Sequence, residues 1–466
     1  MRRLVADSSL VVTPELIRRY DRPCPRYTSY PTADRFHEGF DARDAAAALA
    51  RTDSADASAP LSLYVHLPFC AKLCTYCGCT VVVSKDEDKK RSYLDRVLLE
   101  VDLAASQLTR GRPVKEIHLG GGTPNSYPPE ELARLLAHLE ERFEVAPDAE
   151  ISIEIDPRHA NERLAFELAD IGFGRLSMGV QDFEPRVQEA IGRIQTYGRT
   201  AAAIGAARAA GFRSVNLDLV YGLPLQTRDS FARTVEQTLA LAPDRIALFS
   251  FAYVPDVRPQ QKKIPRAALP PAGEKLAMFC DARAALIEAG YVAIGMDHFA
   301  RPDDPLAIAE RVGTLHRNFQ GYTVLRGADL LGFGMSAISD AGGAYWQNAK
   351  KLVRYDEAVD RGRLPVERGF ALSRDDEARR YIIRELMCSF RVRDADVRAR
   401  YGVSLEADLV PEMDRISDRE IEGLAVRTAD GIEVTELGRL FVRVVASAFD
   451  RYLHEARAAV TYSRAV

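Results

Sequence analysis

The chain has 466 residues, of which 47% are hydrophobic and 28% are charged, and its formal net charge is −4. This composition is typical of a globular protein, and the length allows one large domain and a smaller one. The acidic balance argues against bulk binding to nucleic acid, which usually needs a basic surface. The apolar runs are too short for a membrane span or a signal peptide. We therefore expect a cytoplasmic protein, in a compartment that keeps cysteines reduced.

The first 54 residues are predicted to form an extended arm followed by a helix. Three prolines lie within Asp21–Phe36, so this segment should be extended rather than helical. Asp41–Thr52 is rich in alanine and begins with an aspartate, which predicts a helix that Asp41 caps. Because the arm has too few apolar residues to fold alone, we expect it to lie across the mouth of the next domain.

From Leu61 onward, short apolar runs alternate with helical segments. The runs cover residues 61–66, 115–119, 150–155, 174–180, 214–220 and 245–253. This alternation predicts an α/β fold with a parallel sheet, and six such units form most of a barrel but not a closed eight-stranded one. We assign residues 55–365 to this domain, which ends in loops and a glycine-rich stretch at Asp329–Ser339.

Residues 366–466 are predicted to form a helix-rich domain. Gly423–Asp450 indicates a helix end, a small hairpin around Asp430-Gly431 and then a helix, which is a winged-helix-like pattern. A DNA-binding regulator would also carry such a domain. The acidic net charge and the lack of a concentrated basic helix argue against that function.

Four of the seven cysteines lie in one short stretch after the first apolar run. Cys70, Cys74 and Cys77 have the spacing C-x3-C-x2-C, Tyr76 precedes the third of them, and Cys79 follows. Thiolates are the usual ligands of iron–sulfur clusters, and three of them leave one iron of a four-iron cluster open for chemistry. A structural zinc site would need a second knuckle of ligands, and a disulfide framework is typical of small secreted chains. The spacing therefore favours a cluster.

Polar residues lie at the ends of the predicted strands, where barrel enzymes carry their working side chains. Glu154 ends the third run, Gln181 follows the fourth, and Asp218 lies late in the fifth. The glycines of Gly120–Pro124 follow the second run and would let a ligand approach the backbone closely, although they also suit a plain tight turn. Glu154 and Asp218 lie in apolar runs, so each either binds a ligand or forms an ion pair with Arg175 or Arg193.

The cysteine spacing with Tyr76 is the signature of the radical S-adenosylmethionine enzymes, and further motifs extend the match over nearly the whole chain. The chain resembles the oxygen-independent coproporphyrinogen III oxidase (coproporphyrinogen dehydrogenase) family in Tyr64–His66, Gly78-Cys79, PRYTSYPTA (Pro25–Ala33), GGGTP (Gly120–Pro124), EISIEIDPR (Glu150–Arg158), RLSMGVQDF (Arg175–Phe183), NLDLVYGLP (Asn216–Pro224), GMDHFARPDD (Gly295–Asp304) and HRNFQGYT (His316–Thr323).

The resemblance implies a partial (β/α)6 barrel like that of triosephosphate isomerase, extended by the 291–298 region. It implies a 4Fe-4S cluster on Cys70, Cys74 and Cys77, and two molecules of S-adenosylmethionine. The residues that it places around the cosubstrate are Tyr64, Tyr76, Gly121, Gly122, Thr123, Glu154, Gln181, Arg193, Asp218, Ala252 and Ile338. Cys79 is expected to act in catalysis without binding the cluster, because a fourth ligand would close the iron that must hold the cosubstrate.

The activity that the resemblance implies is the oxidative decarboxylation of two propionates of coproporphyrinogen III to vinyl groups, which gives protoporphyrinogen IX. An unidentified electron donor would reduce the cluster, and we expect a monomer. A substrate with four carboxylates needs cationic anchors, and arginine suits bidentate carboxylate binding. The candidates are Arg22, Arg26, Arg301 and Arg317. His298 and His316 are further candidates.

A haem chaperone that keeps the cluster and transfers haem to partner proteins is the alternative function. Chaperones of that sister group generally lack an equivalent of Cys79 and the PRYTSYPTA arm. This chain has both, so the sequence favours the oxidase.

Overall fold

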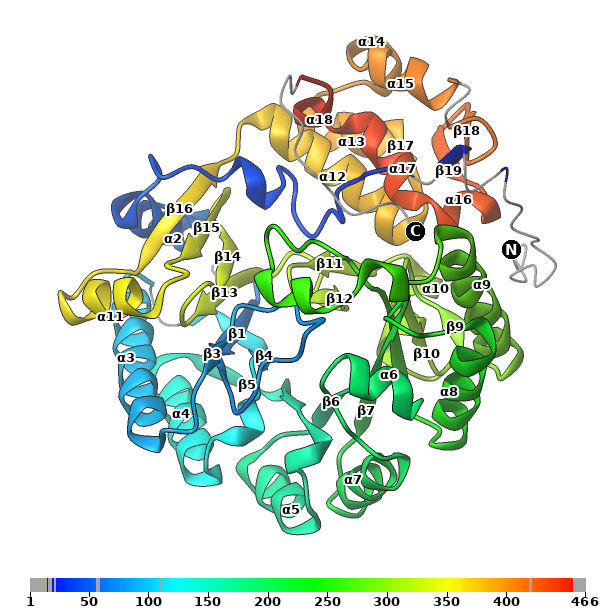
Figure 1. Ribbon diagram of the computed structural model, residues 1–466. Coiled ribbons are helices and arrows are strands. Elements are labelled where there is room, and N and C mark those ends of the chain that lie inside the picture. The colour runs from blue at the N-terminus through cyan, green and yellow to red at the C-terminus, as the bar shows by residue number, and fades with distance from the viewer. Residues whose placement is uncertain are drawn as a thin grey trace.

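The computed structural model describes residues 15, 19–20, 22–55, 59–108, 111–418 and 421–455. Six parallel strands form the centre of the fold, in the order in which they occur in the chain (Figure 1). They are β1 (Leu61–Leu67), β4 (Pro113–Gly121), β5 (Glu144–Ile155), β6 (Arg175–Gln181), β7 (Ser214–Tyr221) and β8 (Arg245–Ser250). The six predicted runs correspond to these strands, so the prediction of a partial barrel is confirmed.

Helices follow the strands, and those named next cover the outside of the curved sheet, except α6, which lies near the middle of the view (Figure 1). They are α3 (Glu87–Ala105), α4 (Pro129–Arg142), α5 (Glu162–Ile171), α6 (Pro185–Ala190), α7 (Tyr197–Ala209), α8 (Arg228–Ala240) and α9 (Ala272–Glu288). Leu132, Leu135 and Leu139 of α4 are fully buried against the sheet. The helical spacing of apolar residues thus defines the face of each helix that packs on the strands.

Both edges of the parallel sheet are extended. Beyond β8 lie β10 (His298–Ala300) and β9 (Val292–Ala293), both antiparallel to their neighbours, as expected for the 291–298 region. Beyond β1 lies β13 (Asp329–Phe333), which is parallel to β1, followed by the antiparallel strands β14 (Ile338–Ala341), β15 (Ala344–Asn348) and β16 (Val366–Ala371). Strands β16 and β9 are the two ends of the sheet, so the described strands do not close into a full barrel.

Sequence analysis assigned no strand to the glycine-rich stretch Asp329–Ser339, which supplies β13 and the start of β14. Glycine in a strand often marks a close approach of two backbones. A Cβ added at Gly332 would lie 2.6 Å from the carbonyl oxygen of Ile338. The glycine therefore allows a tight crossing between two strands, although it indicates a loop in the sequence.

Shorter elements surround the ends of the strands. They are β2 (Phe69–Cys70), β3 (Val82–Val83), α10 (Pro305–Val312), β11 (His316–Asn318), β12 (Gly321–Thr323), α11 (Leu352–Asp360) and the 3₁₀ turns η2 (Pro124–Ser126), η3 (Pro157–His159), η4 (Pro259–Lys263) and η5 (Arg266–Ala268). Among the described residues, none of the helices combines the length and apolar character that a membrane-crossing helix needs.

The C-terminal region consists of short helices around a three-stranded sheet. Its elements are α12 (Arg374–Ser389), β17 (Arg391–Arg393), α13 (Asp394–Tyr401), α14 (Leu405–Asp408), α15 (Val410–Ile416), β18 (Ala425–Thr428), β19 (Gly431–Val434), α16 (Glu436–Leu440), α17 (Val442–Ala446), η6 (Ser447–Phe449) and α18 (Arg451–Glu455). The predicted hairpin is present as β18–β19. The single helix expected after it is interrupted at Phe441, whose backbone (φ −116°, ψ 26°) leaves the helical region.

The N-terminal arm has no helix from Arg22 to Thr32, but it is not extended throughout, because Tyr27 has a φ of +47° and residues 28–31 bend. It is followed by η1 (Ala33–Arg35) and α2 (Ala42–Ala55). Asp41 caps α2, because its Oδ1 accepts hydrogen bonds from the backbone N–H groups of Arg43 (2.7 Å) and Asp44 (3.4 Å). The arm passes between the barrel and the C-terminal region (Figure 1). The sequence predicted contact with the barrel mouth, whereas most of the contacts of the arm are with residues 441–455.

Candidate metal centre

The cysteine loop begins where β1 ends, and its two ends are held together. Strand β2 pairs with β3, so Cys70 and Ser84 are joined by a backbone hydrogen bond of 3.0 Å. Two glutamines after β8 hold the middle of the loop. Gln260 donates to the carbonyl oxygen of Cys77 (2.7 Å) and Gln261 to that of Tyr76 (3.3 Å). The positions of the cysteines are therefore fixed by the barrel and not by the loop alone.

The three motif cysteines line one cavity of about 400 Å³ at the carboxyl ends of the parallel strands. The cavity also contains most of the residues that sequence analysis predicted around the cosubstrate. These are Tyr76, Cys79, Gly121, Gly122, Thr123, Glu154, Gln181, Arg193 and Asp218. Residues from five strand ends thus meet at one place, as expected for the mouth of a barrel.

The thiols fit a cluster better than a single ion. No three His, Cys, Asp or Glu side chains of the described chain are placed to hold one metal ion, whereas each thiolate of a cluster binds a different iron. Burial raises the pKa of Cys70 to about 11, although the Thr123 hydroxyl lies 3.2 Å from its sulfur. The hydrogen bond between Cys77 and Cys79 lowers the pKa of Cys77 to about 7 and raises that of Cys79. Cys79 is exposed and lies beside a motif thiol.

The glycines after β4 bring this strand directly against the base of the cysteine loop. Gly121 has φ +114°, and a Cβ there would lie 2.6 Å from the ring of His66. A Cβ at Gly122 would lie 2.5 Å from the backbone of Pro68. The N–H of Gly122 donates to the carbonyl oxygen of Leu67 (2.8 Å) and that of Thr123 to Phe69 (3.0 Å). Only glycine allows the two backbones to come this close, and the backbone of Gly121–Thr123 therefore lies next to the thiols.

Glu154 of β5 and Asp218 of β7 both line the cavity in the barrel interior but have opposite pKa shifts. Burial opposes ionisation of Glu154, yet hydrogen bonds from His118 (3.4 Å) and the N–H of Gly121 (3.0 Å) lower its pKa. Burial and the charge of Glu154 raise the pKa of Asp218 to about 7. Asn216 donates to Asp218 at 2.7 Å. Glu154 is therefore the stable anion of the cavity and Asp218 its proton-sensitive neighbour.

Neither carboxylate forms an ion pair with an arginine of the described residues, which was the structural alternative in the sequence. Arg175 pairs with Glu150, and Arg193 pairs with Asp156 at 3.2 Å. Both acids can thus bind a ligand that enters the cavity.

Arg193 and Gln181 form the side of the cavity next to β6. Arg193 is 8% exposed, donates to the carbonyl oxygen of Gly179 (2.7 Å), and has a buried Nε with no partner. Gln181 has a positive φ of 70°, which is rare for a residue other than glycine and asparagine and is typical of functional sites. The unsatisfied Nε and the strained backbone both indicate a binding surface.

Three predicted contact residues lie near the cavity but are not part of its lining. The Tyr64 ring stacks on His118 with 5.9 Å between centroids, and its hydroxyl lies 3.0 Å from Nδ1 of His66. Ile338 crosses closely over Gly332, which pairs with Tyr64 in the sheet. Ala252 accepts a hydrogen bond from Gln261, which also holds Tyr76. The structure therefore places all three in the shell around the cavity.

The four candidate arginines are not brought together. Arg26 pairs with Asp297 and lies 6.0 Å from the ring centroid of Phe249, which lines the cavity. Arg317 lies 4.7 Å from the ring centroid of Tyr322, another lining residue. Arg22 instead donates to Ser447 (3.4 Å) in the C-terminal region. Arg26 and Arg317 thus flank the barrel mouth, while Arg22 faces away from it.

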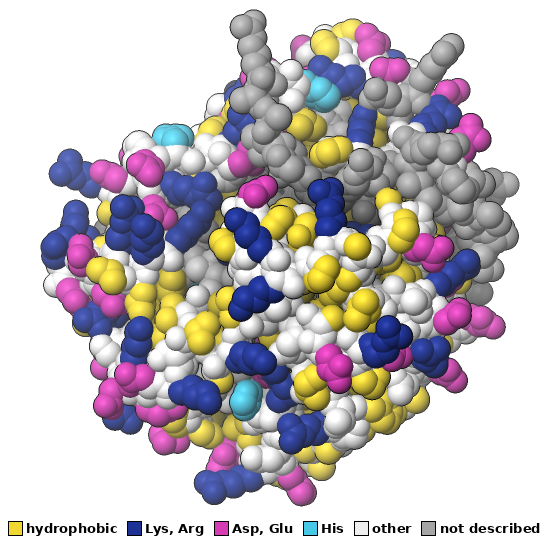
Figure 2. All heavy atoms as spheres, in the orientation of Figure 1, with side chains coloured by type: hydrophobic (Ala, Val, Ile, Leu, Met, Phe, Trp, Pro, Cys, Tyr) yellow, Lys and Arg dark blue, Asp and Glu magenta, His cyan; other side chains and the backbone are white. Residues whose placement is uncertain are grey.

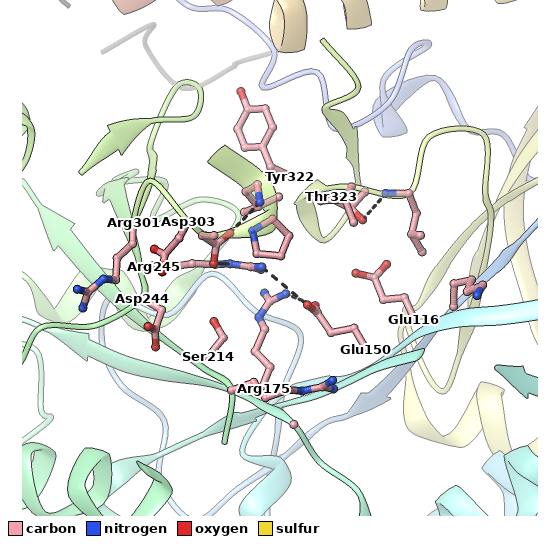
Figure 3. Close-up of a pocket in the computed structure, with 18 of the residues that line it drawn as sticks. Glu116, Glu150, Arg175, Ser214, Asp244, Arg245, Arg301, Asp303, Tyr322 and Thr323 are labelled. Atoms are coloured by element: carbon pink, nitrogen blue, oxygen red, sulfur yellow. Dashed lines mark hydrogen bonds and ion pairs between the residues drawn. The ribbon is translucent and has the colours of Figure 1, made fainter. Parts of the chain in front are cut away.

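Arg301 lies at the opposite end of the barrel and is corrected here as a substrate residue. It follows β10, which is antiparallel to β8, so it emerges at the amino ends of the parallel strands. There it lines a second cavity of about 430 Å³ with Glu116, Glu150, Arg175 and Arg245 (Figure 3). Sequence analysis could not detect this reversal, because the direction of a three-residue strand leaves no local pattern.

Sequence analysis also missed several residues of the site. His118 holds Glu154 and stacks on Tyr64, and Asp156 holds Arg193 (3.2 Å) and Arg158 (2.6 Å). Asp156 lies in one of the motifs, EISIEIDPR, but the motif gave no role for it. His118 precedes the glycine motif, and its only signal is a polar ring in an apolar run.

Exposed lysines lie on the segments around the cysteines, at Lys72, Lys262 and Lys263. On the face seen in Figure 1, Lys and Arg side chains gather near the middle (Figure 2). This local excess contrasts with the net charge of −4 for the whole chain. Such a face attracts anionic molecules.

Comparison with known proteins supports the class that the fold and the cavity define. Residues 64–238 match the model of the Radical SAM superfamily, and residues 372–441 match the HemN C-terminal domain. The chain is 44% identical to an oxygen-independent coproporphyrinogen III oxidase of Synechocystis sp., with 97% of both chains covered. It is 45% identical to the Pseudomonas aeruginosa protein of the same name, over 94% of this chain and 95% of that protein.

A solved structure supports the same class of protein. Coproporphyrinogen III oxidase (HemN) from Escherichia coli, described as a radical SAM enzyme, matches with a TM-score of 0.88 and 43% sequence identity, covering 92% of this chain and 97% of that one. The fold and the cysteine cavity are those of a radical S-adenosylmethionine enzyme. Within that class, the chain belongs to the oxygen-independent coproporphyrinogen III oxidase family. Its cofactors are a 4Fe-4S cluster and S-adenosylmethionine, and the thiols of Cys70, Cys74 and Cys77 fit the cluster.

Proposed function

We propose that this protein converts coproporphyrinogen III to protoporphyrinogen IX without oxygen, by oxidative decarboxylation of two propionates to vinyl groups. The observation that carries the proposal is the cavity in which three thiols, the Gly121–Thr123 backbone and Glu154 meet. When bound, the cluster and its cosubstrate supply a 5′-deoxyadenosyl radical that removes hydrogen from a propionate β-carbon. An electron donor that is not yet identified reduces the cluster, and the protein acts as a cytoplasmic monomer.

The residues of the chain prepare this cavity for a charged cosubstrate. Glu154 remains ionised because His118 and Gly121 donate to it, so it can accept hydrogen bonds from ribose hydroxyls or the ammonium group. Arg193 is fixed by Asp156 and Gly179 and directs its free Nε toward a carboxylate or an adenine nitrogen. Tyr76 is anchored through its carbonyl oxygen and provides an aromatic face. We assign the same role to Gln181 and Asp218.

The haem chaperone receives no support from the relatives, whose names all describe an oxidase. The arm and Cys79 also favour the enzyme. We propose that Cys79 acts in turnover beside the cluster and does not bind it, because its thiol already contacts Cys77 from outside the motif.

The test is product formation by the reconstituted protein under anaerobic conditions, with Cys79→Ser and Cys74→Ser as a matched pair. The wild type should form protoporphyrinogen IX and 5′-deoxyadenosine. Cys79→Ser should keep a normal iron and sulfide content and the binding of S-adenosylmethionine, and lose at least about tenfold in product formation, as is common when a group acts in proton transfer. Cys74→Ser should lose the cluster.

Haem binding by the wild type without product would favour the chaperone instead. Loss of the cluster in Cys79→Ser to the extent seen in Cys74→Ser would show that Cys79 is a ligand. Unchanged turnover in Cys79→Ser would remove it from the mechanism.

A further inference from the structure

A small buried cavity lies where the N-terminal arm, β11 and α12 meet, apart from the cysteine cavity. Its volume is about 20 Å³, and it is lined by residues of the arm from Tyr27 to Tyr30 and by His316, Arg317, Arg380 and Arg384. A cavity of this size accepts one group about as large as a water molecule or a carboxylate end. Three arginines around so small a space are unusual.

Two polar side chains in this cavity are buried without partners. Arg317 is 8% exposed, and its Nε and Nη1 are buried and have no hydrogen-bond acceptor among the described residues. His316 is 6% exposed, and its Nδ1 also lacks a partner. A buried guanidinium without a counter-ion costs several kcal/mol. An anion in the cavity would give these nitrogens the acceptors that they lack.

Each acid near the cavity is already paired with another cation. Asp340 pairs with Arg380 at 2.7 Å, Glu385 pairs with Arg326, and Asp297 pairs with Arg26 and His298. Arg317 and Arg384 are therefore left without an ion pair in the described part of the chain. The lining of the cavity contains three arginines and one carboxylate, that of Asp340.

Arg317 also connects this cavity with the barrel. Its guanidinium lies 4.7 Å from the ring centroid of Tyr322, and Tyr322 lines the cysteine cavity from the other side. An anionic group that extends from a molecule in the barrel mouth therefore has a cationic receptor next to it. The planar guanidinium suits a carboxylate, which it can bind through two hydrogen bonds.

We propose that this cavity, with Arg317 at its centre and Arg384 beside it, binds one carboxylate of the porphyrinogen, on a propionate other than the one that reacts. The proposal rests on the proposed function, because it takes the four carboxylates of that substrate as given. Anchoring a distant propionate positions the macrocycle, so that another propionate lies over the cysteine cavity. The arm forms one wall of the site, so substrate binding depends on where the arm lies.

The experiment is an anaerobic fluorescence titration of the reconstituted holoenzyme with coproporphyrin III, the stable aromatic form that keeps all four propionates. Arg317→Gln should raise Kd at least tenfold, and Arg317→Lys should recover part of the affinity. Arg384→Gln should show a smaller rise. Arg213→Gln removes an exposed arginine at the other end of the barrel and should change Kd less than twofold. Iron content and circular dichroism confirm that each variant is folded and loaded.

The tetramethyl ester of coproporphyrin III identifies the group that is bound. If a carboxylate occupies the cavity, the wild type and Arg317→Gln bind the ester with equal affinity. Unequal affinity for the ester, or equal affinity of both proteins for the free acid, overturns the proposal. If Arg317→Gln does not fold, Arg384→Gln carries the same comparison, since its side chain is less buried.

Two other failures are distinguishable. Inorganic phosphate that raises the melting temperature of the wild type but not of Arg317→Gln, together with unchanged coproporphyrin binding, would assign the cavity to a free anion and overturn the proposal. A wild type that neither binds coproporphyrin nor converts coproporphyrinogen III would refute the proposed function itself. A wild type that does both, beside an Arg317→Gln variant with unchanged Kd, would refute only the carboxylate site.

Discussion

Glu154 of β5 and Asp218 of β7 lie on either side of β6, and their different hydrogen bonds give them different charges near neutral pH. Glu154 accepts from His118 and a backbone N–H, while Asp218 accepts mainly from Asn216. Two adjacent carboxylates share one cavity most favourably when one of them keeps a proton. The pair is therefore ready to bind a cationic group, which would allow both to ionise.

The apoprotein should show this in the pH dependence of its stability. The pKa of Asp218 is raised from its usual range to about 7, so its contribution to stability is fully present below the unfolded pKa and is lost as pH rises through about 7. Asp218→Asn, which cannot ionise, should lose no stability in this way. We expect the urea midpoint of Asp218→Asn to rise relative to wild type between pH 4 and pH 8. A constant difference over this range would contradict the shift.

For single residues, the sequence predicted the site residues at strand ends well. It predicted poorly the neighbouring residues that hold these side chains in place. Glu154 and Asp218 stood out because a buried carboxylate in an apolar run is costly unless it has a partner or binds a ligand. His118 did not stand out, since its role depends on a neighbour 36 positions away. Arg301 was assigned to the substrate because arginine suits carboxylates, but side-chain chemistry alone does not indicate which end of the barrel a residue reaches.

The parallel strands and their helices were predictable because each repeats a local apolar pattern. The edge strands were not, because β13 is short, contains Gly332, and pairs with β1 more than 260 positions earlier in the chain. The glycine-rich stretch, to which sequence analysis assigned no strand, is therefore part of the sheet. Pairing partners that are distant in sequence leave no periodic signal.

The start of α10 provides a test of how the elements are joined at the barrel base. Asp304 caps this helix by accepting from the N–H of Leu306 (2.8 Å), and it pairs with Arg245 of β8 at 2.7 Å, with both side chains 5% exposed or less. Asp304→Ala removes a cap and leaves a buried arginine with only Glu150, at 3.8 Å.

Asp304→Ala should lower the free energy of unfolding by about 3 kcal/mol, since breaking a buried ion pair typically costs 3–5 kcal/mol. The neighbouring Asp303 is exposed, so Asp303→Ala is the matched control and should stay within about 0.5 kcal/mol of wild type. Anaerobic urea titrations followed by circular dichroism measure both. Equal stability of the two variants would show that the pair contributes little.

In the whole molecule, the arm joins the barrel to the C-terminal region. Tyr27 donates to Asp450 (3.0 Å), and Arg443 donates to the carbonyl oxygens of Cys24 and Pro25, the latter at 2.9 Å. On the other side, Arg26 pairs with Asp297 of the barrel. The sequence predicted an extended arm that needs a surface, but the surface consists of residues from the far end of the chain.

Arg443→Met should release this arm while leaving the cluster in place. Hydrogen exchange in residues 22–36 should become at least about tenfold faster, because hydrogen bonds to a charged group contribute about 1.5–3 kcal/mol. Arg427→Met, which removes an exposed arginine paired with Glu406 in the same region, is the control and should leave the arm protected. Protection of residues 22–36 that is the same in both variants would contradict this role for Arg443. Mass spectrometry after deuterium labelling gives the answer.

The contact between Tyr27 and Asp450 also affects how the chain matures during synthesis. These residues are 423 positions apart, so a ribosome that adds 5–20 residues per second needs roughly 20–85 s between them. The barrel strands are all translated within that interval, whereas the C-terminal residues that hold the arm, Arg443 and Asp450, are still missing. The wall of the carboxylate site thus forms only after the last helices emerge, and a nascent chain assembles its thiol loop well before it can hold a porphyrinogen.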